Sequence, residues 1–198
     1  MQTLEVWFEF ASTYSYPAVS RVESIAKAAR VDVAWRPFLL GPIFRDQGWN
    51  DSPFNIYPAK GRYMWRDMER ICERQRLPFR RPSTFPRNGL AAARLAARFE
   101  SEAWMPAFVR GVYSANFSLD EDISDAAVLA RLLDEAGAPA GAQDEGRSDD
   151  AKALLRASTE DAAALGLFGA PSFTVGSELF WGNDRMEDAF EWAAAGGA

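Results

Sequence analysis

Residues 4–16 read LEVWFEFASTYSY, and this stretch carries the first clear secondary-structure signal of the chain. Every second side chain from Leu4 to Phe10 is large and apolar, which predicts a strand over Leu4–Phe10 with one buried face. The pattern then breaks for a few residues. Ser15 can cap a helix that follows, because Pro17 is tolerated in a first helical turn. A strand therefore leads directly into a helix.

The remainder of the chain places this unit in a larger sheet. Small and apolar residues continue at helical spacing up to Ala29, and Val31–Arg36 predicts a second strand, so the opening is a right-handed βαβ unit. Near the other end, Ser172–Val175 and Glu178–Trp181 predict two short strands joined by a turn. A closing helix is expected over Asp184–Ala195, with Asp184 as its cap.

The middle of the chain has a different character. Residues 41–58 are rich in Gly, Pro, Asn and Asp and predict a long loop. Five helical segments follow without a convincing strand: Gly61–Gln75, Arg87–Glu100, Glu102–Ala115, Asp125–Ala136 and Asp149–Leu165. We therefore expect an α/β fold, a βαβ…ββα sheet from residues 1–40 and 167–198. Residues 41–166 would add a loop and a large all-helical insertion.

Composition excludes several kinds of chemistry. The 198 residues include 22 Lys and Arg, 28 Asp and Glu, no His and one Cys, so the net charge is 22 − 28 = −6. Without histidine there is no Ser-His-Asp triad, no Cys-His dyad and no imidazole ligand for a metal. The single Cys72 cannot form an internal disulfide, a CxxC pair or a zinc–thiolate site, and we interpret it as a packing residue. We expect no metal.

The same counts bear on location and partners. No segment is long and apolar enough to predict a transmembrane helix, and the first residues lack the basic-then-apolar plan of a signal peptide. Low cysteine use is typical of a reducing compartment, so a cytoplasmic protein is expected. An isoelectric point near 4.8 disfavours general binding to nucleic acid.

Three segments carry groups that chemistry could use, and each has a plainer interpretation. Ser12 stands where the first strand gives way to a helix, so its hydroxyl could serve an anion or only shape a turn. Pro171 opens a strand after Gly169-Ala170, and a cis bond there would leave backbone free to pair with an extended ligand. Asp184 either caps the last helix or holds a ligand ammonium group.

Five strings along essentially the whole chain together resemble one family: FEFASTYSY (8–16), RPFLLGPIF (36–44), KGRYM (60–64), FGAPSF (168–173) and FWGNDR (180–185). In this order they resemble the 2-hydroxychromene-2-carboxylate isomerase and kappa-class glutathione transferase family. The resemblance implies a DsbA-like thioredoxin fold, glutathione as cofactor and an aromatic-derived unsaturated carboxylate as substrate. It also implies a homodimer.

The resemblance also implies roles for individual residues. Ser12 matches the catalytic serine of the family, although Thr13 stands where many members have proline. The implied glutathione contacts are Ser12, Thr13, Tyr14, Asn50, Lys60, Ala170, Pro171, Asn183 and Asp184, with Asn55 as an alternative to Asn50. In that set the Ala170-Pro171 backbone would pair with the cysteinyl unit, and Asn183 with Asp184 would hold the γ-glutamyl amino end. Trp49, Tyr63 and Trp181 are candidates for an aromatic substrate pocket.

One segment of this acidic protein is strongly basic. Between Lys60 and Arg87 there are nine basic and three acidic residues, an excess of 9 − 3 = +6. Most of these arginines are expected to form a solvated helix face. Lys60 is the exception, and the local excess would attract a carboxylate substrate.

The expected chemistry begins with the thiol of glutathione, which is mostly protonated at neutral pH. A hydroxyl donor beside a helix start would stabilise the thiolate, which could add reversibly to a conjugated double bond. Ser12-Thr13-Tyr14-Ser15 holds no cysteine, so dithiol exchange is excluded. A glutathione transferase or peroxidase, or a DsbA-like protein that only binds a ligand, remain as alternatives.

Overall fold

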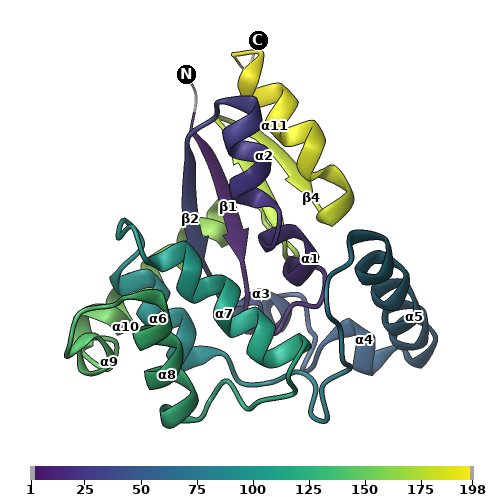
Figure 1. Cartoon of the computed structure of the whole chain (residues 1–198). Coiled ribbons are helices and arrows are strands. Elements are labelled where there is room, and N and C mark those ends of the chain that lie inside the picture. The colour runs from purple at the N-terminus through teal and green to yellow at the C-terminus, as the bar shows by residue number, and fades with distance from the viewer. Residues whose placement is uncertain (1–2, 197–198) are drawn as a thin grey trace.

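The computed structural model describes residues 3–196 and contains one four-stranded sheet, in the order β2-β1-β3-β4 (Figure 1). β1 (Leu4–Phe8) pairs in parallel with β2 (Val33–Pro37). On its other side β1 pairs antiparallel with β3 (Ser172–Val175), which in turn pairs antiparallel with β4 (Glu178–Trp181). The two predicted halves of the sheet, from opposite ends of the chain, therefore meet at β1 and β3.

Helices surround this sheet. Two follow β1 and ten further helical elements lie beyond β2: α1 (Ser15–Val19), α2 (Val22–Ala29), α3 (Leu40–Asp46), α4 (Pro53–Ile56), α5 (Pro58–Gln75), α6 (Leu90–Arg98), α7 (Met105–Phe117), α8 (Ala126–Ala136), α9 (Ala142–Glu145), α10 (Asp149–Ala164), the 3-10 turn η1 (Asn183–Arg185) and α11 (Met186–Ala194). Figure 1 shows α2 and α11 side by side near the two chain ends, while α6 to α10 gather at the opposite end of the sheet.

The alternation of β1 assigns its side chains to two cores. Val6 and Phe8 belong to a large cluster that also contains Phe173 of β3, Tyr113 of α7 and Phe190 of α11. Trp7 points to the opposite face and belongs to a smaller cluster with residues in or next to α3 and α10: Phe38, Ile43, Ala162 and Leu167. The sheet is therefore covered on both faces, and the larger core runs without interruption from the sheet into the helical insertion.

The predicted fold class is confirmed, with differences at the strand ends. β1 stops at Phe8 instead of Phe10, because the Glu9 carbonyl accepts the Ser12 amide hydrogen at 2.9 Å and turns the chain. The second strand runs from Val33 to Pro37. Pro37 is accommodated because β2 lies at the edge of the sheet, where a missing amide hydrogen costs no ladder bond.

The helix after β1 is broken where the sequence predicts a continuous one. α1 ends at Val19 and α2 begins at Val22. At the break, the Ser20 hydroxyl and the Arg21 guanidinium both donate to the Pro17 carbonyl, at 2.8 and 3.4 Å. These side chains replace the backbone donors that a continuing helix would have supplied.

The predicted loop over residues 41–58 is wrong, because α3 and α4 occupy much of it. Ser52 caps α4 by accepting the Phe54 amide hydrogen, and Pro53 stands in the first turn. Pro58 likewise opens α5, three residues before the predicted start. Prolines in first turns initiate helices as readily as they mark loops, so this composition was ambiguous.

The five longer helices of the insertion are confirmed within a few residues, and the described residues between α5 and α10 contribute no strand. Ser148 caps α10 as predicted, accepting the Ala151 amide hydrogen at 3.1 Å. The prediction that Asp184 caps the last helix is wrong. Asn183–Arg185 form a 3-10 turn, and α11 starts at Met186 without a side-chain cap. No helix among residues 3–196 has the length and apolarity to cross a membrane.

Candidate functional site

Ser12 lies where two distant segments of the chain meet. It follows the turn after β1, and its hydroxyl donates a hydrogen bond to the Ala170 carbonyl at 2.7 Å. The same oxygen is 3.4 Å from the Ser15 amide nitrogen, in the position of a weak acceptor. Ser12 therefore takes over the capping role predicted for Ser15, which is fully buried inside α1 while Tyr14 occupies the cap position.

The Ala170-Pro171 segment presents backbone beside Ser12. The Ala170–Pro171 peptide bond is cis, as the sequence predicts, and a second cis bond at Phe85–Pro86 was not predicted. The Gly182 amide donates to the Pro171 carbonyl at 2.9 Å, so the turn after β4 lies against the same segment. Two loops and the Ser12 turn thus converge at one end of the central strands.

An exposed aromatic pair borders this convergence. Trp181 is 52% exposed and packs against Phe168, with ring centroids 4.9 Å apart. A Cβ at Gly169 would lie 2.3 Å from the Trp181 ring nitrogen, so only glycine lets the indole approach the backbone this closely. Trp181 was a predicted substrate contact, whereas Phe168, 45% exposed, was not singled out by the sequence.

Asn183 and Asp184 have different surroundings although they are neighbours. The Asn183 side-chain carbonyl accepts a hydrogen bond from Arg21 at 3.1 Å, and Arg21 also forms an ion pair with Glu187. Asn183 is therefore already engaged in holding η1 against the helix start at Arg21. The Asp184 side chain is 77% exposed, and its weak contact is with Arg185 at 3.9 Å.

Tyr14 connects the Ser12 turn to α5 and to Asp184. Its hydroxyl donates to Asp67 at 3.1 Å. Burial, followed by the charge of Asp67 and smaller effects of Tyr63 and Asp184, raises the pKa of Tyr14 well above its ordinary 10. The predicted residues Tyr14, Tyr63 and Asp184 thus share one electrostatic neighbourhood. Thr13 turns away from it, being buried with its hydroxyl 3.1 Å from the Met64 sulfur.

The predicted residues from the connection to α5 are more scattered. Lys60 is exposed, with its ammonium nitrogen 4.8 Å from the centre of the Tyr57 ring. Asn55 donates to Asp51 and to the Phe85 carbonyl. Asn50 is exposed, and Trp49 packs against Phe44 of α3, with centroids 5.5 Å apart. The structure shows no contact that brings Trp49, Asn50 or Lys60 onto Ser12.

Glu9 is a functional candidate that the sequence analysis did not single out. Its carboxylate accepts the Ala11 amide hydrogen at 3.0 Å, and its carbonyl accepts the Tyr113 hydroxyl at 2.7 Å. Burial raises the pKa of Glu9 from 4.5 to about 7, although the amides of Ala11 and Ser12 oppose the shift. The available signal was a carboxylate three residues before Ser12, at the end of a buried strand.

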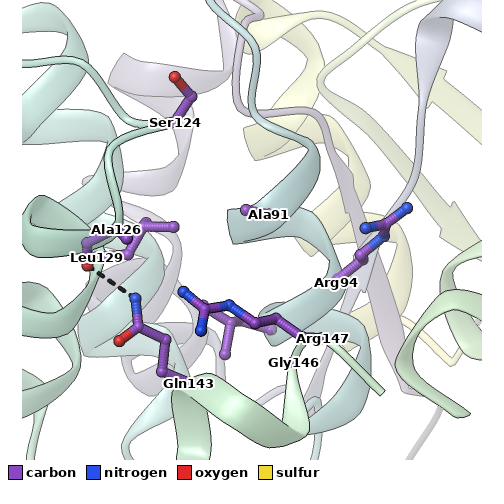
Figure 2. A pocket seen from close by; sticks show the side chains of 9 residues that line it. Ala91, Arg94, Ser124, Ala126, Leu129, Gln143, Gly146 and Arg147 are labelled. Atoms are coloured by element: carbon purple, nitrogen blue, oxygen red, sulfur yellow. Dashed lines mark hydrogen bonds between the residues drawn. The ribbon is translucent and has the colours of Figure 1, made fainter. Parts of the chain in front are cut away.

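A shallow cavity lies elsewhere in the molecule. It has a volume of about 270 Å³ and opens between α6, α8 and α9 (Figure 2). Two polar side chains on its wall already have partners: Gln143 donates to the Ala126 carbonyl, and Arg147 pairs with Asp144 at 3.4 Å. None of the predicted site residues lines this cavity, so it is separate from the site at Ser12.

Comparisons with known proteins identify relatives of the whole chain. The family model for the DSBA-like thioredoxin domain matches residues 3–191. The 2-hydroxychromene-2-carboxylate isomerase of Sphingobium xenophagum is 29% identical over 189 residues, covering 94% of this chain and 95% of that protein. Human glutathione S-transferase kappa 1 is 25% identical, covering 94% of this chain and 88% of that protein.

A solved structure shows the same architecture. The structure of a 2-hydroxychromene-2-carboxylate isomerase superposes with a TM-score of 0.85 at 22% identity, covering 98% of this chain and 94% of the other. The likeness therefore includes both the sheet and the helical insertion.

Proposed function

Because the chain belongs to the DSBA-like thioredoxin domain family, we propose that it is a glutathione-dependent enzyme. More specifically, we propose a cis–trans isomerase acting on an aromatic-derived unsaturated carboxylate. The observation that carries the proposal is the hydrogen bond from the Ser12 hydroxyl to the Ala170 carbonyl at 2.7 Å. It joins the two segments that the resemblance to the isomerase and kappa-class family assigns to glutathione.

The residues around Ser12 fit a peptide thiol. The hydroxyl of Ser12 is a donor for a thiolate, and the exposed Asp184 carboxylate is a partner for an ammonium group. Ala170 and Pro171 offer backbone to the cysteinyl unit, and the exposed Lys60 ammonium offers a cation to a carboxylate. Thr13 is buried against Met64, so in the proposed complex it contributes backbone only.

When bound, glutathione would supply a thiolate that adds to the conjugated double bond, lets it rotate as a single bond, and leaves again. The chain itself has to stabilise that sulfur anion. A serine carries one hydroxyl proton, and in this structure that proton is directed at Ala170. In the proposed complex, the Ser12 hydroxyl turns from the Ala170 carbonyl to the sulfur. The carbonyl then becomes free to accept an amide hydrogen of the ligand.

Ser12 is proposed as a hydrogen-bond donor and not as a nucleophile. The chain contains no histidine that could remove the Ser12 proton, and its one cysteine, Cys72, is buried in α5. α1 has only five residues, so the dipole behind Ser12 is smaller than the sequence suggested and the hydroxyl has the larger share of the stabilisation.

Aromatic and basic groups support an aromatic carboxylate as substrate. Trp181 with Phe168 forms an exposed aromatic surface beside Ala170, and Tyr63 of α5 is 63% exposed. The basic excess over residues 60–87 would favour the approach of an anionic substrate to this side of the molecule. We propose that these features together select a planar aromatic acid.

A transferase is the second candidate, because human glutathione S-transferase kappa 1 is 25% identical over nearly the whole chain. The protein should be incubated with stoichiometric glutathione and a hydroxychromene carboxylate, while isomer ratio and free thiol are both followed. Isomer conversion with constant free thiol supports the isomerase, and loss of thiol in proportion to product supports the transferase. Binding of glutathione without either change would leave a binding protein and contradict both enzymatic proposals.

We also propose that the enzyme acts as a homodimer, as its resemblance to the isomerase and kappa-class family implies. Sedimentation velocity over a range of protein concentrations tests this directly. A species of one 22.0 kDa chain at all concentrations would contradict it.

A further inference from the structure

The turn that presents Ser12 is organised around Glu9. The Glu9 carbonyl accepts two hydrogen bonds, one from the Ser12 amide at 2.9 Å and one from the Tyr113 hydroxyl at 2.7 Å. The Glu9 carboxylate accepts a third, from the Ala11 amide at 3.0 Å. One residue thus closes the turn from both its backbone and its side chain.

We propose that Glu9 is a positioning residue for Ser12. The Glu9 carboxylate holds the Ala11-Ser12 backbone in the orientation that places the Ser12 hydroxyl at the reacting sulfur. The inference rests on the proposed function, because that function makes Ser12 the group that contacts the sulfur. Glu9 itself is assigned no contact with either substrate and no nucleophilic role. Its effect passes through the Ala11 amide.

Two side chains of α7 hold carbonyl groups of the same turn. Asn116 of α7 donates to the Phe10 carbonyl at 3.1 Å, and Tyr113 of the same helix donates to Glu9. Both bonds fix carbonyls, whereas the Ala11 amide depends on the Glu9 carboxylate. Loss of that acceptor would leave a part-buried amide hydrogen without its partner, and the backbone between Ala11 and Ser12 would relax.

The charge of Glu9 has no opposite charge to fix it. Among the described residues no Lys or Arg forms an ion pair with Glu9, and the titratable group that faces it is Tyr113 of α7. Burial, with a smaller effect of Glu9, keeps the pKa of Tyr113 well above 10, so this hydroxyl stays neutral. With a pKa of about 7, Glu9 gains or loses its proton near neutral pH. The acceptor strength at the Ala11 amide then varies across the same range.

The experiment follows the Ala11 amide by nitrogen–proton NMR from pH 5 to 9 in the ligand-free protein. We expect its chemical shift to titrate with a midpoint near the pKa of Glu9, about 7, and to be flat in Glu9→Gln. Glu5→Gln is the matched control, because Glu5 lies on β1, the strand that leads into Glu9, but pairs with Arg36 at 3.0 Å. In Glu5→Gln, the chemical shift of the Ala11 amide should titrate as it does in the wild type. A wild-type curve that is flat and coincides with that of Glu9→Gln would overturn the inference, because the Ala11 amide would then not sense the Glu9 carboxylate.

The positioning role needs a second readout on bound glutathione. Glu9→Ala should lower kcat by about tenfold or more with little change in KM, and should raise the apparent pKa of the bound thiol, because a displaced Ser12 donates poorly. Glu9→Gln keeps an acceptor for the Ala11 amide, so its kcat and its bound-thiol pKa should lie close to those of the wild type. If Glu9→Ala only unfolds more easily while the thiol pKa stays unchanged, Glu9 shapes the fold and does not position Ser12.

The two proposals fail in different ways. If the wild-type protein does not bind glutathione, the proposed function is wrong, although the Ala11 titration still shows whether Glu9 controls the turn. If glutathione binds and turns over normally in Glu9→Ala, only the inference about Glu9 is wrong.

Discussion

The hydroxyl of Ser12 is a single group on which the proposed chemistry depends. Ser12→Ala removes the donor, so we expect the apparent pKa of bound glutathione to rise by about 1–2 units, the equivalent of a hydrogen bond to a charged group. Turnover should fall, while glutathione affinity is reduced less. Ultraviolet absorbance of the thiolate as a function of pH measures the shift.

Ser15→Ala is the control for that measurement. Ser15 lies in α1 only three residues away, but it is fully buried in the helix and should leave the thiol pKa as in the wild type. Equal thiol pKa values in Ser12→Ala and wild type would refute the role given to Ser12.

Glu9 also has a consequence for stability that does not depend on any ligand. Burial raises the pKa of Glu9 to about 7 from an ordinary 4.5. Between pH 4.5 and pH 7, the native state therefore keeps a proton on Glu9 that the unfolded chain has released. The stability contribution of Glu9 is therefore fully present below pH 4.5 and is lost as pH rises through 7.

Glu9→Gln should remove this dependence. Relative to wild type, the variant should gain up to about 3 kcal/mol of unfolding free energy between pH 4 and pH 8. Urea unfolding of both proteins at several pH values measures the difference. A difference that stays constant with pH would show that the pKa of Glu9 is the same in the native and unfolded states.

The turn η1 that precedes α11 carries a prediction about Asp184. Because Asp184 is exposed and caps no helix, Asp184→Ala should change the unfolding free energy by less than about 0.5 kcal/mol. If its carboxylate holds the glutathione ammonium, Kd should rise about ten- to a hundredfold, as calorimetry would measure.

Asp188→Ala provides the comparison, since Asp188 is another exposed carboxylate one turn further along and also contacts Arg185, at 3.3 Å. It should leave Kd unchanged. Equal loss of affinity in both variants would indicate a general effect of negative charge instead of a contact at Asp184.

Which elements could be predicted depends on how local their signal is. The alternation in β1 and the helical spacing of α5 to α8 and α10 were sufficient, since each pattern is set by the buried face of one segment. The break after Val19 and the helices α3 and α4 were missed. They depend on side chains such as Ser20 and Ser52 binding particular backbone groups, and composition does not distinguish such helix starts from loops.

The candidate site was predictable in part for the same reason. Ser12, Ala170 and Pro171 were expected together from the resemblance, and the structure places Ser12 in contact with Ala170. Glu9 and Phe168 were missed, because their importance comes from partners far along the chain, Tyr113 and Trp181. A sequence read segment by segment contains no signal for such pairs.

The molecule as a whole links the helical insertion to the site through α7. Tyr113→Phe removes the hydroxyl that donates to Glu9, so we expect a loss of about 1 kcal/mol in unfolding free energy. Amide hydrogen exchange at Ala11 and Ser12 should become faster, because the turn loses one of the hydrogen bonds that hold it in place.

Tyr16→Phe is a suitable comparison for this effect. Tyr16 also donates a part-buried hydrogen bond, at 2.6 Å, but its acceptor is the Pro78 carbonyl after α5 and not a group of the Ser12 turn. It should cost similar stability without changing exchange at Ala11 and Ser12. If both variants accelerate exchange there equally, the turn responds to global stability alone.

The bond between Ser12 and Ala170 has a final consequence, for discrimination among thiols. Any ligand that draws the hydroxyl away strips the Ala170 carbonyl of its donor, and an unsatisfied carbonyl costs about 1–3 kcal/mol. A cysteinyl peptide can replace the lost hydrogen bond with its own amide hydrogen, whereas 2-mercaptoethanol has no amide and cannot. The hydrogen bond of the ligand-free protein would thus weaken the binding of small thiols that have no amide hydrogen for the Ala170 carbonyl. Competition of 2-mercaptoethanol against glutathione should show the penalty in the wild type and a reduced one in Ser12→Ala.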